Sequence, residues 1–229
     1  MAKTIIIAGF GTGISKAVAE KFGKEGFQLA LVARNADRLG QAVKEFEGRG
    51  IRAAAFPTDL ADPEGVRRLA GSVRDKLGPV NVLHWNAYSM PAGDLLAADA
   101  AALRSLFDIP IASLVLTVQA VLPDLRAQKD GAILITNGGL GVLDANMEAM
   151  AVNYNAMGLA LANAAKHKLS RVLAQKLGPE GIYVGEVMVL GTVKGTSWDN
   201  GSATVEASAI ADRFWQIYGA RKDANVTIS

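Results

Sequence analysis

The first residues that could do chemistry are closely spaced glycines near the start of the chain. The stretch AGFGTGIS (8–15) follows a short β-branched run and precedes a helix-like pattern. Glycine allows a tight turn and lets backbone N–H groups approach a phosphate, and a helix start favours negative charge. A flexible turn is the alternative, but a strand before the glycines and a helix after them favour a phosphate cradle. The residues expected to hold a pyrophosphate are Gly9, Gly11, Thr12, Gly13 and Ile14.

A second polar group lies where the next apolar run ends. The sequence there is ARN, and Arg34 stands where a dinucleotide-binding chain commonly has an acid for the ribose 2′-hydroxyl of NAD. A guanidinium can bind a 2′-phosphate through two parallel hydrogen bonds, and Arg38 lies one helical turn further on. Arg34, Asn35 and Arg38 therefore predict NADP rather than NAD, although two solvated surface arginines would give the same pattern.

Two further apolar runs end in residues that could contact the rest of a nucleotide. In TDL (58–60), Asp59 could accept a hydrogen bond from the adenine amino group, with Leu60 as an apolar neighbour. In the next run, Asn86 and Ala87 could line the adenine ribose. Asn86 is also a common residue at the turn after a strand, and the two roles are compatible.

The composition excludes several other kinds of chemistry. The chain has no cysteine and only two histidines, so disulfides and thiolate catalysis are excluded and we expect no metal site. His84 is expected to be a hydrogen-bonded core residue, whereas His167, followed by Lys168, is expected to be exposed. The net charge of +2 and the lack of a basic run predict no nucleic-acid partner. The apolar N-terminal run is too short for a signal peptide or a membrane span, so we expect a cytoplasmic protein.

An alternating series of strands and helices must position these residues. Apolar runs predict strands at 4–9, 27–34, 51–59, 80–87, 131–138 and 181–191. Helical periodicity predicts helices at 14–26, 35–50, 62–78, 99–128 and 153–177. This alternation predicts an α/β fold, a Rossmann-type doubly wound parallel sheet with helices on both faces, in a single domain over 1–229. Ligands of such sheets bind beyond the carboxyl ends of the strands.

Taken together, these motifs resemble the short-chain dehydrogenase/reductase family over nearly the whole chain. AGFGTGI is similar to the family's TGxxxGxG loop, ARN to its NADP-preferring strand end, TDL to its adenine contact and WNAY to its NNAG motif. Ser15 replaces the third loop glycine, and Tyr88 replaces the last glycine of NNAG. The stretch ITNGGLGV (135–142) and a tail of an aromatic-rich helix and a short strand resemble an atypical branch, whose members are described as oxidoreductases by homology.

The resemblance implies a catalytic tetrad of asparagine, serine, tyrosine and lysine, from which this chain departs. None of the residues at the four expected positions can replace the family's tyrosine–lysine pair in acid–base catalysis. Lys166 lies one helical turn after the expected lysine position and could reach back toward the ribose. Tyr154 lies too far along the segment to act as the usual tyrosine, but could line the substrate side. The four expected positions hold Pro110, Gly138, Leu159 and Asn163.

These residues leave more than one function open. We expect an NADP-dependent oxidoreductase for a small carbonyl or alcohol substrate, with a non-standard or missing proton donor. The alternative is a non-catalytic NADP(H)-binding sensor or partner protein. A chain that binds nothing well is a third possibility, supported chiefly by the bulky Tyr88. The apolar helices at 99–128 and 153–177, together with the resemblance, predict a homodimer or homotetramer.

Overall fold

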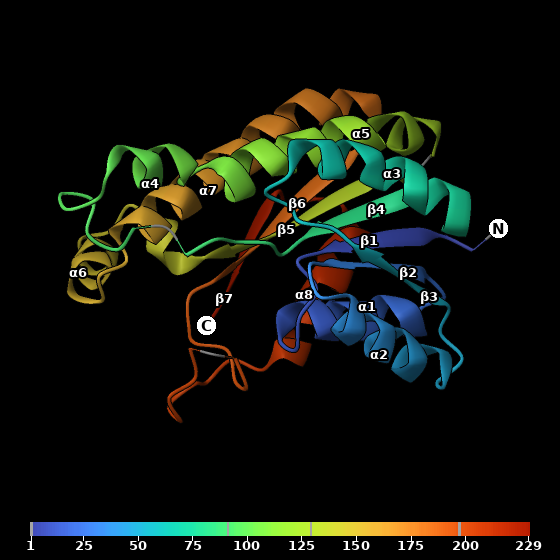
Figure 1. The fold of residues 1–229 in the computed structure, drawn as a ribbon, viewed down its shortest axis with the longest axis horizontal. Helices are drawn as coiled ribbons and strands as arrows, with labels where there is room; N and C mark the ends of the chain where they lie inside the picture. Colours follow the sequence, from blue (N-terminus) through green and yellow to red (C-terminus); the bar gives the residue numbers. More distant parts are fainter. Residues whose placement is uncertain (1, 91, 129, 197) are drawn as a thin grey trace.

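The computed structural model of the chain describes residues 2–90, 92–128, 130–196 and 198–229. These residues form a parallel sheet of seven strands in the order β3-β2-β1-β4-β5-β6-β7 (Figure 1). The Rossmann-type fold predicted from the sequence is confirmed, with strands slightly shorter than predicted. The strands are β1 (Thr4–Ala8), β2 (Gln28–Ala33), β3 (Ala53–Pro57), β4 (Val80–Trp85), β5 (Ala132–Gly138), β6 (Tyr183–Val189) and β7 (Asn225–Ile228).

Helices cover both faces of the sheet, which is why its central strands are apolar runs rather than alternating ones. In β1, Ile6 packs into the core on one face, while Ile5 and Ile7 pack into the core on the other. The first face carries α3 (Pro63–Leu77), α5 (Leu114–Ala127) and α7 (Met157–Leu177), and the second carries α1 (Ile14–Lys24), α2 (Ala36–Glu47) and α8 (Ala207–Ala220) (Figure 1). The shorter helices are α4 (Ala100–Ser105), the π-helical η1 (Asp108–Ser113), η2 (Gly139–Gly141), α6 (Ala145–Asn153) and η3 (Gly178–Glu180).

The single helix predicted over 153–177 is wrong, because the chain breaks between α6 and α7. Asn155 has a left-handed backbone, with φ of 51°, and the chain changes direction there after α6. The N–H groups of Met157 and Gly158 donate to the carbonyl oxygens of Gly93 and Ala92, at 2.9 and 3.2 Å. A segment more than sixty residues earlier therefore satisfies the first donors of α7, a contact that the local sequence pattern does not reveal.

The topology places the ligand-binding edge at one end of the molecule. The chain order reverses between β1 and β4, which are neighbours in the sheet. In an open parallel sheet, this reversal leaves a crevice beyond the carboxyl ends of the strands. The glycine-rich turn after β1 and the ends of β2, β4, β5 and β6 all lie at this edge, on the left in Figure 1.

Candidate functional site

The glycine-rich turn after β1 packs tightly against the end of β4. Gly9 has φ of +80°, and a Cβ placed on it would lie 2.6 Å from the Cα and N of Ala87. The N–H of Asn86 donates to the carbonyl oxygen of Ala8 at 2.9 Å. Only glycine combines this backbone with so close an approach, so Gly9 fixes the turn against Ala87.

The start of α1 has no side-chain cap, unlike the starts of α2, α3, α4 and α6. Its N-cap residue, Gly13, makes no side-chain capping bond, and its first turn has no acid. The side chains of Asn35, Asp62, Asp99 and Asp144 cap α2, α3, α4 and α6. The first N–H groups of α1 are therefore left for another acceptor, and an anion suits the positive end of a helix.

Neighbouring residues shape this turn from two sides. The hydroxyl of Ser15, which replaces the third glycine, accepts a hydrogen bond from the N–H of Gly11 at 2.8 Å. Thr196, in the segment after β6, packs over the turn, since a Cβ on Gly13 would lie 2.9 Å from its Cγ2. Gly11 and Thr12 are exposed at the tip, and Ile14 begins α1. A serine thus supports the turn without filling it.

Two exposed arginines lie at the end of β2 and in the first turn of α2. Among the described residues, neither Arg34 nor Arg38 makes an ion pair. Asn35 caps α2, and its Oδ1 accepts a hydrogen bond from the N–H of Arg38 at 2.9 Å. The guanidinium groups are therefore available to an anionic ligand, whereas the Oδ1 of Asn35 is already used as a helix cap.

The remaining predicted nucleotide contacts differ in how accessible they are. Asp59 is exposed, with one carboxylate oxygen accepting from the N–H of Ala61 at 3.0 Å. Asn86 is partly buried, and its Nδ2 lies 3.5 Å from the carbonyl oxygen of Gly9. Leu60 and Ala87 are buried, and Leu60 packs in the core beneath α3 and α5. Asp59 and Asn86 thus present polar groups near this edge, while Leu60 and Ala87 mainly support them.

Of the positions expected for the tetrad, Gly138 and Asn163 lie side by side, although neither residue is reactive. A Cβ on Gly138 would lie 2.8 Å from the side-chain nitrogen of Asn163, which is itself buried. Leu159 is partly buried one turn earlier in α7. Pro110 is buried in η1, which packs against α7, and lacks the N–H that a regular helix would use. The four residues occupy the expected region and offer no acid or base of their own.

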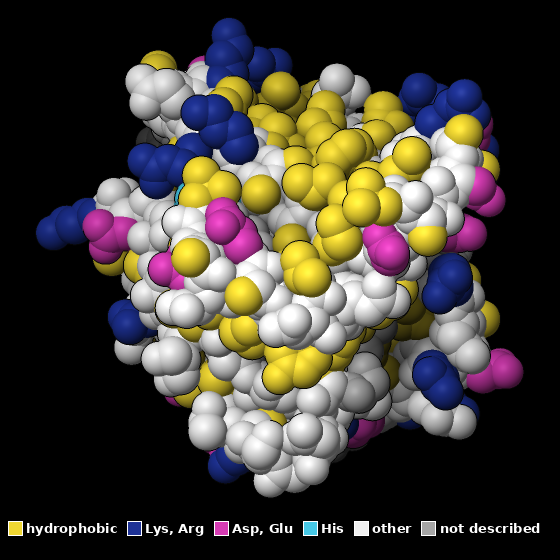
Figure 2. Space-filling model, turned by 90° about the vertical axis from the view of Figure 1, so that its left-hand side faces the viewer, with side chains coloured by type: hydrophobic (Ala, Val, Ile, Leu, Met, Phe, Trp, Pro, Cys, Tyr) yellow, Lys and Arg dark blue, Asp and Glu magenta, His cyan; other side chains and the backbone are white. Residues whose placement is uncertain are grey.

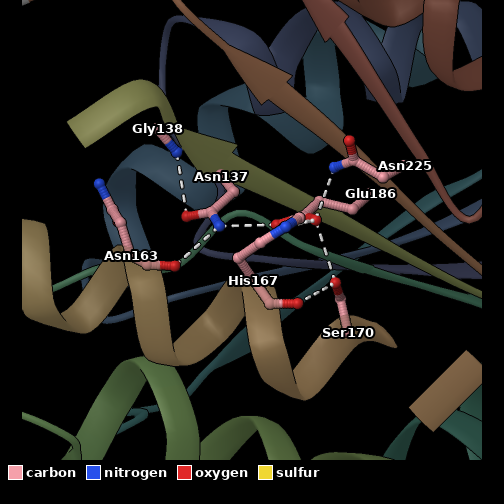
Figure 3. Close-up of polar contacts among 7 residues, drawn as sticks. All are labelled: Asn137, Gly138, Asn163, His167, Ser170, Glu186 and Asn225. Atoms are coloured by element: carbon pink, nitrogen blue, oxygen red, sulfur yellow. Dashed lines mark hydrogen bonds and ion pairs between the residues drawn. The ribbon is translucent and has the colours of Figure 1, made fainter. Parts of the chain in front are cut away.

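Beneath this region lies a polar cluster around the carboxylate of Glu186, which is fully buried in β6 (Figure 3). One carboxylate oxygen accepts from the side-chain amide of Asn137 at 2.6 Å. The other is bonded to His167 Nδ1 at 2.6 Å, Asn225 Nδ2 at 2.8 Å and Ser170 Oγ at 3.0 Å. Donors from β5, α7 and β7 thus converge on a single acid, which is why the sheet can bury it.

Asn137 connects this cluster to the tetrad positions. Its Nδ2 also donates to the carbonyl oxygen of Asn163 at 3.0 Å, and its Oδ1 accepts from the N–H of Gly138 at 3.0 Å (Figure 3). Asn137 therefore holds the end of β5 and the middle of α7 in fixed register.

Of the two candidate acid–base residues, Lys166 has the more unusual surroundings. Its side chain is buried, and burial lowers the pKa of Lys166 to about 8, while the negative charge of Glu186 acts to raise it. Tyr154 is 72% exposed where α6 ends. Lys166 is thus the buried candidate of the two, whereas Tyr154 lies at the surface.

The histidines and Glu186 show where the sequence interpretation succeeded and failed. His84 is buried as predicted, bonds to Thr136 Oγ1 at 3.1 Å, and has its pKa lowered to about 3 by burial. The prediction that His167 is exposed is wrong, because its ring is partly buried against Glu186. Glu186 was missed, although a lone acid inside an apolar strand is the signal that could have found it. The described residues contain no group of three His, Cys, Asp or Glu suited to a metal ion.

Comparison with known sequences identifies one matching family. The family model described as short chain dehydrogenase matches residues 3–204. An uncharacterized oxidoreductase of Listeria monocytogenes is 31% identical over 140 residues, which cover 61% of this chain and 56% of that protein. The 1-deoxy-11-beta-hydroxypentalenate dehydrogenase of Streptomyces exfoliatus is 27% identical over 223 residues, covering 95% of this chain and 80% of that protein. The match with the Listeria protein thus spans little more than half of that relative's length.

Solved structures share the fold over almost the whole chain. The L-sorbose reductase of Gluconobacter frateurii, in complex with NADPH and L-sorbose, superposes with a TM-score of 0.84 at 23% identity, covering 100% of this chain and 95% of that one. A short chain oxidoreductase of Pseudomonas aeruginosa, bound to NADPH and containing an atypical catalytic center, has a TM-score of 0.86 at 20% identity, covering 99% and 95%. At these identities, the likeness establishes the fold.

Proposed function

The chain belongs to the short chain dehydrogenase family, and from that premise we propose that it is an NADP-dependent oxidoreductase acting on a small carbonyl or alcohol. The observation that carries the cofactor assignment is the pair of exposed arginines, Arg34 and Arg38, with no ion-pair partner among the described residues. A 2′-phosphate would supply the missing negative charge, whereas the 2′-hydroxyl of NAD would leave both guanidinium groups without a partner.

The turn after β1 suits the rest of such a cofactor. The uncapped N–H groups at the start of α1 would bind the pyrophosphate. Because Gly9 lets the turn pack closely against Ala87, the space beyond the turn would be left for the pyrophosphate. Asp59 and Asn86 would contact the adenosine half at the ends of β3 and β4. Bound NADPH would supply the hydride, so the chemistry left to the protein is orientation and proton transfer.

The buried amine of Lys166 is the group we assign to proton transfer at the substrate oxygen. Long helical side chains lean toward the helix N-terminus, so Lys166 leans toward the turn that contains Asn163. In the reducing direction, the Lys166 ammonium would give a proton to the substrate oxygen, and solvent would return a proton to the amine; bound NADPH would supply the hydride. Loss of a positioned acid costs about 10²–10⁴ in rate, so even a chain without one would retain hydride transfer.

A non-catalytic NADP(H)-binding protein is the second candidate. It is favoured by the residues at the tetrad positions, because Gly138 and Asn163 pack against each other and leave no side chain to orient a substrate oxygen. A sensor or partner of this kind would bind the cofactor tightly and turn nothing over.

One experiment separates these functions. NADPH is titrated into the protein by fluorescence, and its oxidation is then followed at saturating cofactor against a panel of small ketones, aldehydes and diketones. Binding with turnover supports the oxidoreductase, and binding without turnover on any substrate supports the sensor. Absence of NADPH binding, or tighter binding of NADH, would contradict the proposal itself.

We also propose that α5 and α7 pair with a second copy of the chain. The helical stretch Ala100–Ala127 is long enough and apolar enough to qualify as a membrane span. Only 39% of its most apolar window is buried in this fold. Leu161 and Val172 of α7 are 47% and 51% exposed. Figure 2 shows hydrophobic side chains in the upper part of the molecule, where Figure 1 places α5 and α7, with Lys and Arg mainly around the margin. An apolar face of this kind is better suited to helix packing than to water.

A further inference from the structure

A pocket of about 500 Å³ lies at the opposite end of the sheet from the proposed cofactor site. Its lining includes Tyr183, the first residue of β6, and Ala224, the residue before β7. Gly178, at the end of α7, and Arg221, at the end of α8, also line it. Because the strands are parallel, this pocket lies at their amino ends, whereas the proposed nucleotide contacts lie at their carboxyl ends.

Three cationic residues line this pocket. Arg171 lies in α7, Arg221 is the C-cap residue of α8, and Lys222 follows it in the chain. Among the described residues, no aspartate or glutamate belongs to the lining. Within the same part of the chain, neither Arg171 nor Lys222 makes an ion pair. The pocket therefore gathers positive charge that its own lining does not neutralise.

The guanidinium of Arg221 is held in place by the protein. Its backbone is left-handed, with φ of 51°, which is uncommon for arginine. Its Nη2 donates to the carbonyl oxygens of Asp130 and Gly131. The guanidinium also lies 5.9 and 5.6 Å from the ring centroids of Tyr183 and Tyr218. A guanidinium has more N–H donors than these bonds use, so it offers a ligand a charge that is already positioned.

Negative groups near the pocket reduce its positive charge without cancelling it. Asp223 lies in the segment that leads into β7 and is exposed. Two other nearby acids are paired, Glu180 with Arg126 and Asp130 with Lys3. The carboxyl ends of α7 and α8 each contribute about half a negative charge. Three full positive charges outweigh one carboxylate and two helix ends, so the pocket favours an anion.

The rest of the lining suits a ligand larger than a bare ion. A volume of about 500 Å³ is within the range of small-molecule sites, roughly 300–1,000 Å³. Ala174, Ile182 and Val184 place apolar side chains in the same lining as the cations. Arginine and lysine donors match the oxygen atoms of a phosphate group.

We propose that this pocket binds a small phosphate ester, with its phosphate on Arg171, Arg221 and Lys222 and its organic part against the apolar lining. The proposal goes beyond the proposed function and does not rest on it, because none of these residues belongs to the cofactor site.

The site can be tested residue by residue with inorganic phosphate and phenyl phosphate as probes. Phenylglyoxal modifies arginine side chains, and mass spectrometry of the folded protein follows its rate at Arg171, with the exposed Arg67 of α3 as the reference. Each probe is compared with chloride at equal ionic strength. We expect saturable protection of Arg171, about tenfold when the probe is present at ten times its Kd, and no protection of Arg67. Phenyl phosphate should act at lower concentration than inorganic phosphate, because its ring gains the apolar lining.

A variant and its matched control separate this site from general surface charge. Lys222→Ala should raise the phosphate concentration that half-protects Arg171 by about tenfold, since a lost bond to a charged partner typically costs that much affinity. Lys176→Ala removes an exposed lysine in the last turn of α7, outside the described lining, and should leave this midpoint nearly unchanged.

Three results would overturn the proposal. One is the absence of protection at Arg171 with either probe, and another is equal slowing at Arg171 and Arg67, which is charge screening. The third is protection by vesicles that contain phosphatidic acid but not by phenyl phosphate, which would identify a lipid surface instead. Failure of the proposed function has a different signature, since a protein that does not bind NADPH would still show protection of Arg171.

Discussion

The side-chain amide of Asn163 lies against Gly138, 2.8 Å from the point where a Cβ at position 138 would begin. The residue expected to be lysine thus occupies the space next to the residue expected to be serine. The two departures from the family pattern are therefore coupled, since the Asn163 amide has this space only because residue 138 has no side chain.

This contact predicts a non-additive pair of substitutions. Gly138→Ala should destabilise the protein by about 1 kcal/mol through overpacking, because the buried Asn163 amide has to shift. In the background of Asn163→Ala, the same change should cost less than half as much. Urea unfolding of the four proteins in the cycle measures the coupling, and strictly additive effects would show that the contact carries no energy.

Two glycines of the turn after β1 should respond differently to the same substitution. Gly9→Ala should destabilise the fold by about 2–4 kcal/mol, because it combines a left-handed backbone with a clash against Ala87. Gly11→Ala is the matched control, since nothing lies within 4 Å of its added methyl group. Thermal unfolding compares the two, and equal losses of stability would contradict this account of the turn.

The nucleotide preference should depend on the arginines at the end of β2. The double variant Arg34→Ala/Arg38→Ala should weaken NADPH binding by roughly tenfold or more and leave NADH binding nearly unchanged, because hydrogen bonds to a charged partner contribute about 1.5–3 kcal/mol. Arg67→Ala, an exposed arginine paired with Glu64, serves as the control for loss of surface charge. A parallel loss of affinity for both nucleotides would argue against a 2′-phosphate contact.

Lys166 should leave a signature in the pH dependence of stability. Its pKa is lowered to about 8 in the folded protein from 10.5, so between these values the unfolded chain binds more protons than the folded one. Its contribution therefore destabilises the folded state fully below pH 8 and is relieved as pH rises toward 10.5, a change of about 3 kcal/mol. Lys166→Met should lack this rise, and urea unfolding at pH 7 and pH 10 provides the comparison. Parallel pH profiles for the two proteins would contradict the assignment.

Self-association should depend on the outer face of α7. Leu161→Glu combined with Val172→Glu should convert a dimer or tetramer into a monomer at micromolar concentration, because the new charges would have to be buried between helices. Leu96→Glu, at a position 92% exposed in the segment before α4, is the control and should leave the assembly intact. Analytical ultracentrifugation measures the mass, and a monomeric wild type would remove this proposal.

Most of the fold could be predicted from local patterns, whereas the most unusual part of the site could not. Apolar runs such as that of β1, and caps such as Asn35 and Asp62, act within a few residues, so the sequence reports them directly. The break before α7 depends on carbonyl groups at 92 and 93, far away in the chain. The donors to Glu186 come from three separate elements, and no local pattern indicates that they meet.

The bond between Asn225 and Glu186 also bears on the order in which parts of the protein fold. The two residues are 39 positions apart, so a chain growing on the ribosome presents β6 well before β7 exists. Until then, the carboxylate lacks one of its donors, and a buried acid with an incomplete shell favours an open, hydrated arrangement. Docking of β7 therefore supplies a donor that this carboxylate otherwise lacks, and a folding phase that tracks residue 225 would be its kinetic trace.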